Sequence, residues 1–481
     1  ITVDNSSAEM HTTIFSIATS PKNPNMIWVG TDDGNVQLTR DGGKTWTNLT
    51  GNLKGVPKHA WVSSLEPGHF DEGTAYATFD MHTFGDMKPY VYKTTDFGKT
   101  WTLLAGANMR GYAHVVKEDL VNKNLLFAGT ELGLWVSVDA GGQWAQYKGG
   151  DFPNVAVRDM VIHPRDHDLI LGTHGRGIWI VDDITPLRAL SADVMSKEVA
   201  FVQSEPAIQK LQAGGGWSNG DAVFVGENSP DDAVITYYQR KRHIFGDLKI
   251  EVLDSKGQIV GSIPASKRRG LNRVRWSMRI PAPNVPPAAS VAGGAITGPR
   301  LLPGTYTVRM TKDKAVYETP LKVVGDPRLK HTAADRQAQF DLVMKLHRMF
   351  DDMTAAVGRM NFVRLALDDR AAKAADASLR SRLQTASAQV DELRRKIVAT
   401  KEGGAITGEE RLREYLSNLY GDVNSYEGRP SQTQVDRSES LKRELGDVTT
   451  SFDSWLAKEL SGINAALAAA KLEPINLPAP K

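Results

Sequence analysis

Short apolar runs separated by turn residues fill residues 1–190 of the chain. The runs are rich in β-branched and aromatic side chains, and Gly, Asp and Asn stand between them. This pattern is typical of short β-strands joined by tight turns. The runs can be laid out as four similar units, at residues 14–49, 61–104, 112–147 and from Val155 onward. We expect each unit to form one small antiparallel sheet.

One eight-residue pattern, Ser/Thr-x-Asp-x-Gly-x-x-Trp, occurs in the first three units, with copies that begin 55 and 43 residues apart. A period of this size is the signature of a β-propeller blade array. The hydroxyl and the carboxylate can both accept hydrogen bonds from backbone N–H groups in a tight turn, the Gly takes a positive φ, and the Trp covers the core between sheets. We therefore assign a structural, hairpin-closing role to twelve residues: Thr39, Asp41, Gly43, Trp46, Thr94, Asp96, Gly98, Trp101, Ser137, Asp139, Gly141 and Trp144.

The hydrophobic pattern changes twice after residue 190. Alternating runs between residues 233 and 324 predict a second β region, in which the Pro/Gly/Ala-rich segment 281–300 is expected to be a mobile loop. From Thr332 onward apolar residues recur at helical spacing, with Asp335 in the first turn. Further helices are expected at about residues 374–400, 408–426 and 434–470.

These patterns predict a mostly β protein with an α-helical C-terminus, since 481 residues are too many for one core. Residues 1–190 are expected to form four blades of a partial β-propeller. Residues 191–330 are expected to form a linker and a β-sandwich of immunoglobulin or fibronectin type, and residues 331–481 an antiparallel helical bundle.

The composition excludes several classes of function. The formal net charge of +2 gives no electrostatic attraction to nucleic acid, so we expect no nucleic-acid partner. The chain has no Cys, which excludes disulfides, thiolate zinc sites and thiol nucleophiles. No apolar run is long enough to span a membrane. Phosphate-binding Gly loops are absent, and no cofactor is expected. The chain opens on Ile1 rather than Met, and we expect a processed product or a fragment.

The repeated pattern resembles the Asp-box, or bacterial neuraminidase repeat, of sialidases, some xyloglucan-cleaving glycosidases and sortilin-type propellers. The surrounding segments 89–96, 125–131 and 172–183 are similar to those of large bacterial Asp-box proteins labelled glycosyl-hydrolase-like or sortilin-like. The chain looks like the C-terminal half of such a protein. The resemblance implies an exported protein, secreted or periplasmic, that acts on or binds a polysaccharide. The alternative it leaves open is a non-catalytic propeller receptor or scaffold that binds a peptide or protein.

Blade geometry indicates where chemistry can lie. Strands alternate in direction, so the loops between second and third strands share one end of the blades with the connections between blades. Glycoside hydrolysis needs a carboxylic acid and a second carboxylate there, although a loop acid can equally cap a turn. The candidate catalytic residues are Asp80, Asp86 and Glu131, and the candidate ligand-binding residues are His82, Arg110, His174 and Arg176.

Two other sets of residues contain groups that could bind an anion or a metal ion. Arg110, Arg158 and Arg176 do not have the spacing of a sialidase arginine triad, and Arg176 can instead pair with Asp182 or Asp183. The segment 163–168 contains two His and two Asp residues, but its position predicts an ordinary turn between strands, and no metal site is expected.

Four blades are too few to close a propeller ring of this type. We expect the remaining blades to come from an upstream part of the same protein or from a second chain, and we favour the first source. The expected ligand is a glycan or a peptide.

Overall fold

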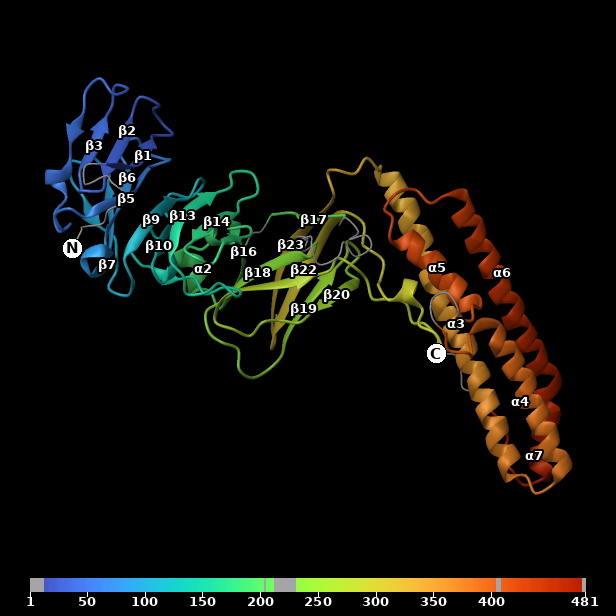
Figure 1. Ribbon diagram of the computed structural model, residues 1–481. Helices are drawn as coiled ribbons and strands as arrows, with labels where there is room; N and C mark the ends of the chain where they lie inside the picture. Colours follow the sequence, from blue (N-terminus) through green and yellow to red (C-terminus); the bar gives the residue numbers. More distant parts are fainter. Residues whose placement is uncertain (1–12, 203–204, 212–230, 404–407, 478–481) are drawn as a thin grey trace. The chain divides into compact units, whose positions relative to one another are not determined.

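The computed structural model describes residues 13–202, 205–211, 231–403 and 408–477. The chain, drawn in Figure 1, divides into two compact units. The first unit contains Ile1–Glu205, Ile235–Phe245 and Ser266–Arg273, and the second contains Pro206–Val234, Gly246–Ala265 and Val274–Lys481.

Four small antiparallel sheets follow one another along the first unit, coloured from blue to green in Figure 1. In each, consecutive strands are neighbours, and we call these sheets blades 1 to 4. Blade 1 consists of β1 (Ile14–Thr19), β2 (Ile27–Thr31), β3 (Val36–Thr39) and β4 (Thr47–Asn48). Blade 2 consists of β5 (Trp61–Pro67), β6 (Ala75–Met81), β7 (Asp86–Thr94) and β8 (Thr102–Leu103).

Blades 3 and 4 repeat this order of strands. Blade 3 consists of β9 (Ala113–Glu118), β10 (Leu126–Thr130), β11 (Gly133–Ser137) and β12 (Ala145–Gln146). Blade 4 has three strands among the described residues: β13 (Val157–Ile162), β14 (Leu169–Thr173) and β15 (Ile178–Val181). The first strands of neighbouring blades contact one another, and buried apolar side chains fill the space between the sheets. Four-stranded antiparallel sheets packed in series are the building units of β-propellers.

Two further sheets follow the blades. After the short helices α1 (Thr185–Arg188) and α2 (Ala192–Ser196), a three-stranded sheet has the order β16-β18-β21 and a five-stranded sheet the order β17-β23-β22-β19-β20. The strands are β16 (Val199–Val202), β17 (Ala207–Gln209), β18 (Ala233–Gln239), β19 (Leu248–Leu253), β20 (Ile259–Ile263), β21 (Gly270–Trp276), β22 (Gly304–Lys312) and β23 (Ala315–Gly325). The strands β18 to β23 coincide with the β region predicted between residues 233 and 324, and face-to-face packing as a sandwich stays a prediction.

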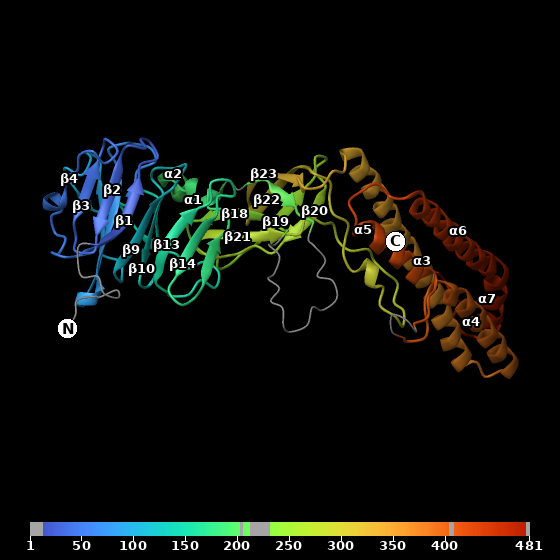
Figure 2. The same cartoon turned by 45° about the horizontal axis from the view of Figure 1, so that its top comes forward.

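The C-terminal helices lie side by side in both views (Figures 1 and 2). They are α3 (Ala333–Lys373), α4 (Ala377–Ile397), α5 (Leu412–Asn424), α6 (Gln432–Trp455) and α7 (Ser461–Ala469), the last two joined by a π-helical turn at Leu456–Leu460. Thr332 and Asp335 form a capping box at the start of α3. The apolar faces of the helices meet in one core.

The segment 281–300 is not the mobile loop that its composition suggested. Ala292 and Ala295 are buried in the helical core, and the Tyr420 hydroxyl donates a 2.9 Å hydrogen bond to the Thr297 carbonyl. Gly294 lies so close to the backbone of Ser417 that a Cβ would collide with it. The Pro/Gly/Ala composition therefore reflects a close approach to α5.

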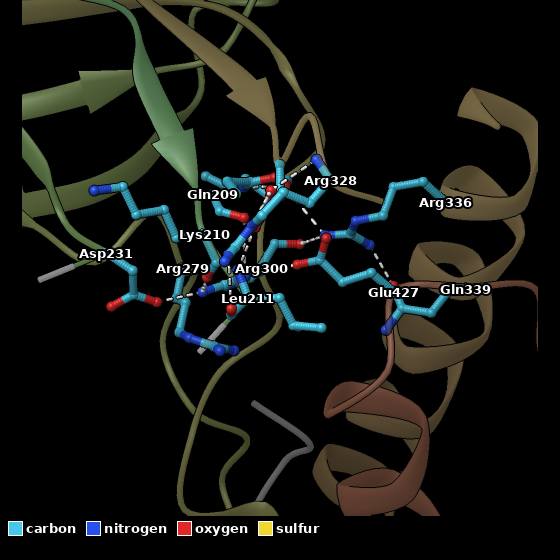
Figure 3. A network of polar contacts seen from close by, with 12 residues as sticks. Gln209, Lys210, Leu211, Asp231, Arg279, Arg300, Arg328, Arg336, Gln339 and Glu427 are labelled. Carbon is cyan, nitrogen blue, oxygen red and sulfur yellow. Dashed lines mark hydrogen bonds and ion pairs between the residues drawn. The ribbon is translucent and has the colours of Figure 1, made fainter. Parts of the chain in front are cut away.

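A buried polar network lies between this segment and the helices within the second unit (Figure 3). Arg300 donates to Glu427 at 2.7 Å and also forms an ion pair with Asp231. Arg336, from α3, donates to the Arg300 carbonyl at 2.8 Å. Burial lowers the pKa of Arg336, and burial together with the Arg300 charge lowers the pKa of Arg279. Arginines outnumber carboxylates in this network, so each carboxylate matters to its stability.

Candidate functional site

The first strand of every blade carries a β-bulge at the same place. In each case the register with the second strand shifts by one residue near the start of the first strand. A bulge leaves one residue without a cross-strand partner and redirects its side chain, and bulges are frequent beside active sites. The extra residues, in chain order, are Phe15, Ser63, His114 and Arg158.

Two of these bulge residues meet at the carboxylate of Asp80, near the end of β6. Asp80 Oδ2 lies 3.1 Å from His114 Nδ1 and 4.0 Å from Arg158 Nη1. Asp80 Oδ1 accepts a 2.9 Å hydrogen bond from the backbone N–H of His82 and lies 2.6 Å from His82 Nδ1. The carboxylate is 2% exposed. It therefore holds residues of blades 2, 3 and 4 together at one strand end.

Tyr112 forms the second centre of the cluster. Its ring stacks on the His82 ring, with centroids 4.4 Å apart and planes inclined by 16°, and its hydroxyl accepts a 2.9 Å hydrogen bond from Arg158 Nη2. Phe15, from blade 1, lies with its ring centroid 5.3 Å from that of Trp61 and 6.5 Å from that of His114. We name Asp80, His82, Tyr112, His114 and Arg158, with Phe15 and Trp61, the strand-end cluster.

Electrostatics keep the Asp80 carboxylate charged. Burial alone would raise the pKa of Asp80, but hydrogen bonds from His114 and from the backbone and ring of His82 outweigh burial and lower it. Burial raises the pKa of Tyr112; the Arg158 charge opposes this, and the Asp80 and Glu131 carboxylates add to it. Asp80 therefore cannot serve as a proton donor near neutral pH. Each His turns Nδ1 towards Asp80, and Nε2 is the nitrogen left for a ligand or a proton transfer.

The structure brings together some of the residues predicted from the sequence. Asp80 and His82 are in direct contact. Glu131 follows β10, and its backbone N–H donates to the Tyr112 carbonyl at 3.0 Å. The Glu131 charge is one of the causes that raise the pKa of Tyr112. Asp86 instead accepts a 2.7 Å hydrogen bond from the hydroxyl of Tyr90, four residues along the same strand.

The remaining predicted residues show no interaction with the cluster among the described contacts. Arg110 is exposed in the connection before β9, and His174 and Arg176 are exposed in the loop between β14 and β15. The Arg176 carbonyl accepts a 3.0 Å hydrogen bond from the Trp179 indole. No ion pair between Arg176 and Asp182 or Asp183 occurs in the described part of the chain.

The repeated eight-residue motif forms the same turn in all three copies. The Thr39 hydroxyl accepts a 2.9 Å hydrogen bond from the Gly43 N–H and donates to Asp41 at 2.8 Å, while Asp41 accepts from the Thr45 N–H at 2.9 Å. Equivalent bonds recur in the second and third turns. The motif Gly residues have φ between 78° and 96°. These carboxylates are engaged in turn geometry and lie in the connections between third and fourth strands.

No group of metal-ligating residues that could hold an ion occurs in the described ranges. The segment 163–168 is a tight turn between β13 and β14, closed by the His163 N–H donating to the Asp168 carbonyl at 2.8 Å. In the same ranges no helix is long and apolar enough to cross a bilayer.

The fold and site thus define a protein of blade-like antiparallel sheets with a polar and aromatic cluster at one strand end and a helical C-terminal part. No protein-family model matches the chain. A stretch of 97 residues is 32% identical to a probable oligoxyloglucan-reducing end-specific xyloglucanase of Neosartorya fischeri. This stretch is 20% of the chain and spans 11% of the xyloglucanase.

Solved structures similar to the chain include the GH74 xyloglucanase of Xanthomonas campestris, with 14% identity, 64% of this chain and 45% of the other covered, and a TM-score of 0.29. PorZ of the type-IX secretion system of Porphyromonas gingivalis aligns with 12% identity over 67% of this chain and 47% of its own, with a TM-score of 0.28. Scores of this size do not establish a common fold, so the blade assignment depends on the sheets of this chain.

Proposed function

We propose that this chain belongs to an exported, glycan-directed protein of glycoside-hydrolase type, and that the strand-end cluster binds the sugar. One observation carries the proposal: the bulges place Phe15, His114 and Arg158 at one strand end, around a charged Asp80. Ligand sites commonly combine aromatic surfaces with a few fixed polar groups. The stretch similar to a xyloglucanase supports a β-glucan such as xyloglucan as the first polysaccharide to test.

In the hydrolytic form of this proposal the two carboxylates have different roles. Asp80 is buried and already bonded to two imidazoles, so it orients His82 and His114 rather than attacking a sugar. Glu131 is less buried than Asp80 and its charge helps to raise the pKa of Tyr112, and it is the residue we assign to proton transfer. A Glu131→Gln variant is expected to keep sugar binding and to lose hydrolysis.

Binding is tested with the recombinant chain, xyloglucan oligosaccharides and titration calorimetry. Phe15, a member of the cluster, is 47% exposed, and Phe15→Ala is expected to weaken binding several-fold, because aromatic faces contribute packing to a bound ring. Phe245→Ala removes an 85% exposed Phe outside the cluster and is the matched control, expected to have no effect. Equal effects of the two substitutions, or no binding of any polysaccharide by the unaltered chain, would contradict the proposal.

A second candidate function is a non-catalytic, sortilin-like receptor or scaffold for a peptide or protein. The saturated hydrogen bonding of Asp80 favours it, because a carboxylate with both oxygens engaged is not free for chemistry. Sugar binding without any release of reducing ends by the unaltered chain would remove the hydrolytic role and keep the binding role. Binding of peptides in place of sugars at the cluster would support the receptor.

A further inference from the structure

The three junctions between blades in this chain follow one packing rule. On the side that faces the following blade, the third-strand residue that pairs with Gly30, Thr78 or Gly129 of the second strand is apolar and buried. These residues are Val36, Val91 and Leu134, each at most 1% exposed. On the side that faces the preceding blade, the equivalent first-strand residues Leu65, Val116 and Met160 are at most 5% exposed. Blades 2 and 3 thus each have two apolar faces, and each face is covered by one neighbouring blade.

In blade 4, the face that in blades 1 to 3 packs against the following blade is uncovered. Ile178 occupies the position of Val36, Val91 and Leu134 in the strand register, yet it is 75% exposed. Val161, Ile170 and Ile180 form a cross-strand row on the same face, and Val161 and Ile180 are both 54% exposed. An apolar row of this kind is rare on a surface that has no partner.

Blade 1 has the opposite face uncovered. Ile17 occupies the position of Leu65, Val116 and Met160 and is 65% exposed. Trp46, in the first copy of the motif, is 45% exposed, whereas Trp144 in the third copy is 3% exposed and donates to the Leu104 carbonyl of the preceding connection at 2.9 Å.

The motif glycines show the same difference. Leu49 and Leu104, from the connections that precede blades 2 and 3, lie against Gly98 and Gly141, within 2.5 Å and 2.8 Å of where a Cβ would be. The space beside Gly43 is open, with no atom within 4 Å of the equivalent point. The first motif therefore has the geometry for a preceding blade, and the described residues do not supply one.

We propose that the faces of blades 1 and 4 are docking surfaces for further blades of the same polypeptide, encoded before residue 1. Every junction in the chain joins sheets that are consecutive in sequence, so the neighbour that covers Ile17 and Trp46 is the blade preceding blade 1. Residues 185–477, where described, contain no further four-stranded sheet whose strands are consecutive and in order, as they are in blades 1 to 3. Ring closure brings the first of the preceding blades against blade 4.

The proposal is tested by measuring side-chain exposure in the native polypeptide, purified from its source, and in the recombinant 481-residue chain. Hydroxyl-radical footprinting read by mass spectrometry reports oxidation at single side chains. Trp46, Ile17 and Ile178 are expected to be oxidised readily in the recombinant chain and several-fold less in the native polypeptide. Phe245, 85% exposed and outside both faces, is the control and should be oxidised equally in both.

The intact mass of the native polypeptide distinguishes the sources of the covering blades. A mass well above 52.6 kDa together with protection of Trp46 and Ile178 supports the proposal. A native mass of 52.6 kDa with Trp46 still oxidised would overturn it. Protection in a native polypeptide of 52.6 kDa that self-associates would assign the faces to a second copy and would also overturn it.

Discussion

At the scale of single residues, the turn motif depends on a hydroxyl that is hidden from water. Thr94 is 1% exposed, and its Oγ1 accepts a 2.9 Å hydrogen bond from the Gly98 N–H. Thr94→Val keeps the shape but leaves this buried N–H without an acceptor. We expect a loss of about 1–3 kcal/mol in the free energy of unfolding, measured by urea denaturation.

Thr100→Val is the control for this substitution. Thr100 also bonds to the motif, through a 2.7 Å hydrogen bond to Asp96 Oδ2, but it is exposed, so water replaces the lost partner. The urea midpoint is expected to stay close to that of the unaltered chain. Equal losses for the two variants would show that burial of the Thr94 hydroxyl does not matter.

The same motif also determines how the Asp41 carboxylate titrates at low pH. Hydrogen bonds from the Thr45 hydroxyl and backbone N–H, and then from Thr39, lower the pKa of Asp41 to about 2 from 3.8. A lowered folded-state pKa means that the charged Asp41 stabilises the fold above about pH 3.8 and that this contribution is lost as the pH falls towards 2. Thr45→Val is expected to raise the pKa of Asp41, measured by carboxyl ¹³C NMR. Thr47→Val, in β4, should leave it unchanged.

At the scale of elements, the junction between the segment 281–300 and the helices depends on the carboxylate of Glu427. Glu427 is 7% exposed and accepts from Arg300, in a network that also contains Arg279 and Arg336 (Figure 3). Glu427→Gln removes a buried negative charge and leaves the arginines in excess. We expect a loss of about 3–5 kcal/mol in the free energy of unfolding, measured by thermal and urea denaturation.

Glu439→Gln is the matched control for the charge itself. Glu439 accepts from Lys345 at 2.6 Å, but its side chain is 52% exposed, so the pair is screened by solvent. The thermal midpoint of the Glu439→Gln variant is expected to stay near that of the unaltered chain. If Glu427→Gln were as mild as Glu439→Gln, the network would not hold this junction.

Much of the element order could be predicted because local turn and cap chemistry marks it. Gly and Asp turns delimit the strands of blades 1 to 3, and Thr332 begins α3 where the sequence indicates a cap. The three-residue strand β17 was missed because its pairing with β23 joins residues more than a hundred positions apart. The segment 281–300 was misread because composition does not report what a loop packs against.

The site was predicted only in part, for a similar reason. Asp80 and His82 were expected in the loop between second and third strands, whereas the structure places Asp80 near the end of β6 and His82 directly after that strand. His114 and Arg158 lie inside first strands and face the site only because bulges redirect them. The sequence did contain a signal for these two residues. In two successive blades, the second residue of the first strand is large and polar.

At the scale of the whole molecule, the central claim is that one strand end of the blades binds a glycan through the cluster around Asp80. Selective labelling of the histidines allows each imidazole to be followed by NMR during titration with a xyloglucan oligosaccharide. We predict that the His82 and His114 signals shift with the same saturation curve, because both rings turn Nδ1 towards Asp80, while His163 and His331 do not move. Saturable binding that leaves His82 and His114 unshifted would contradict the claim.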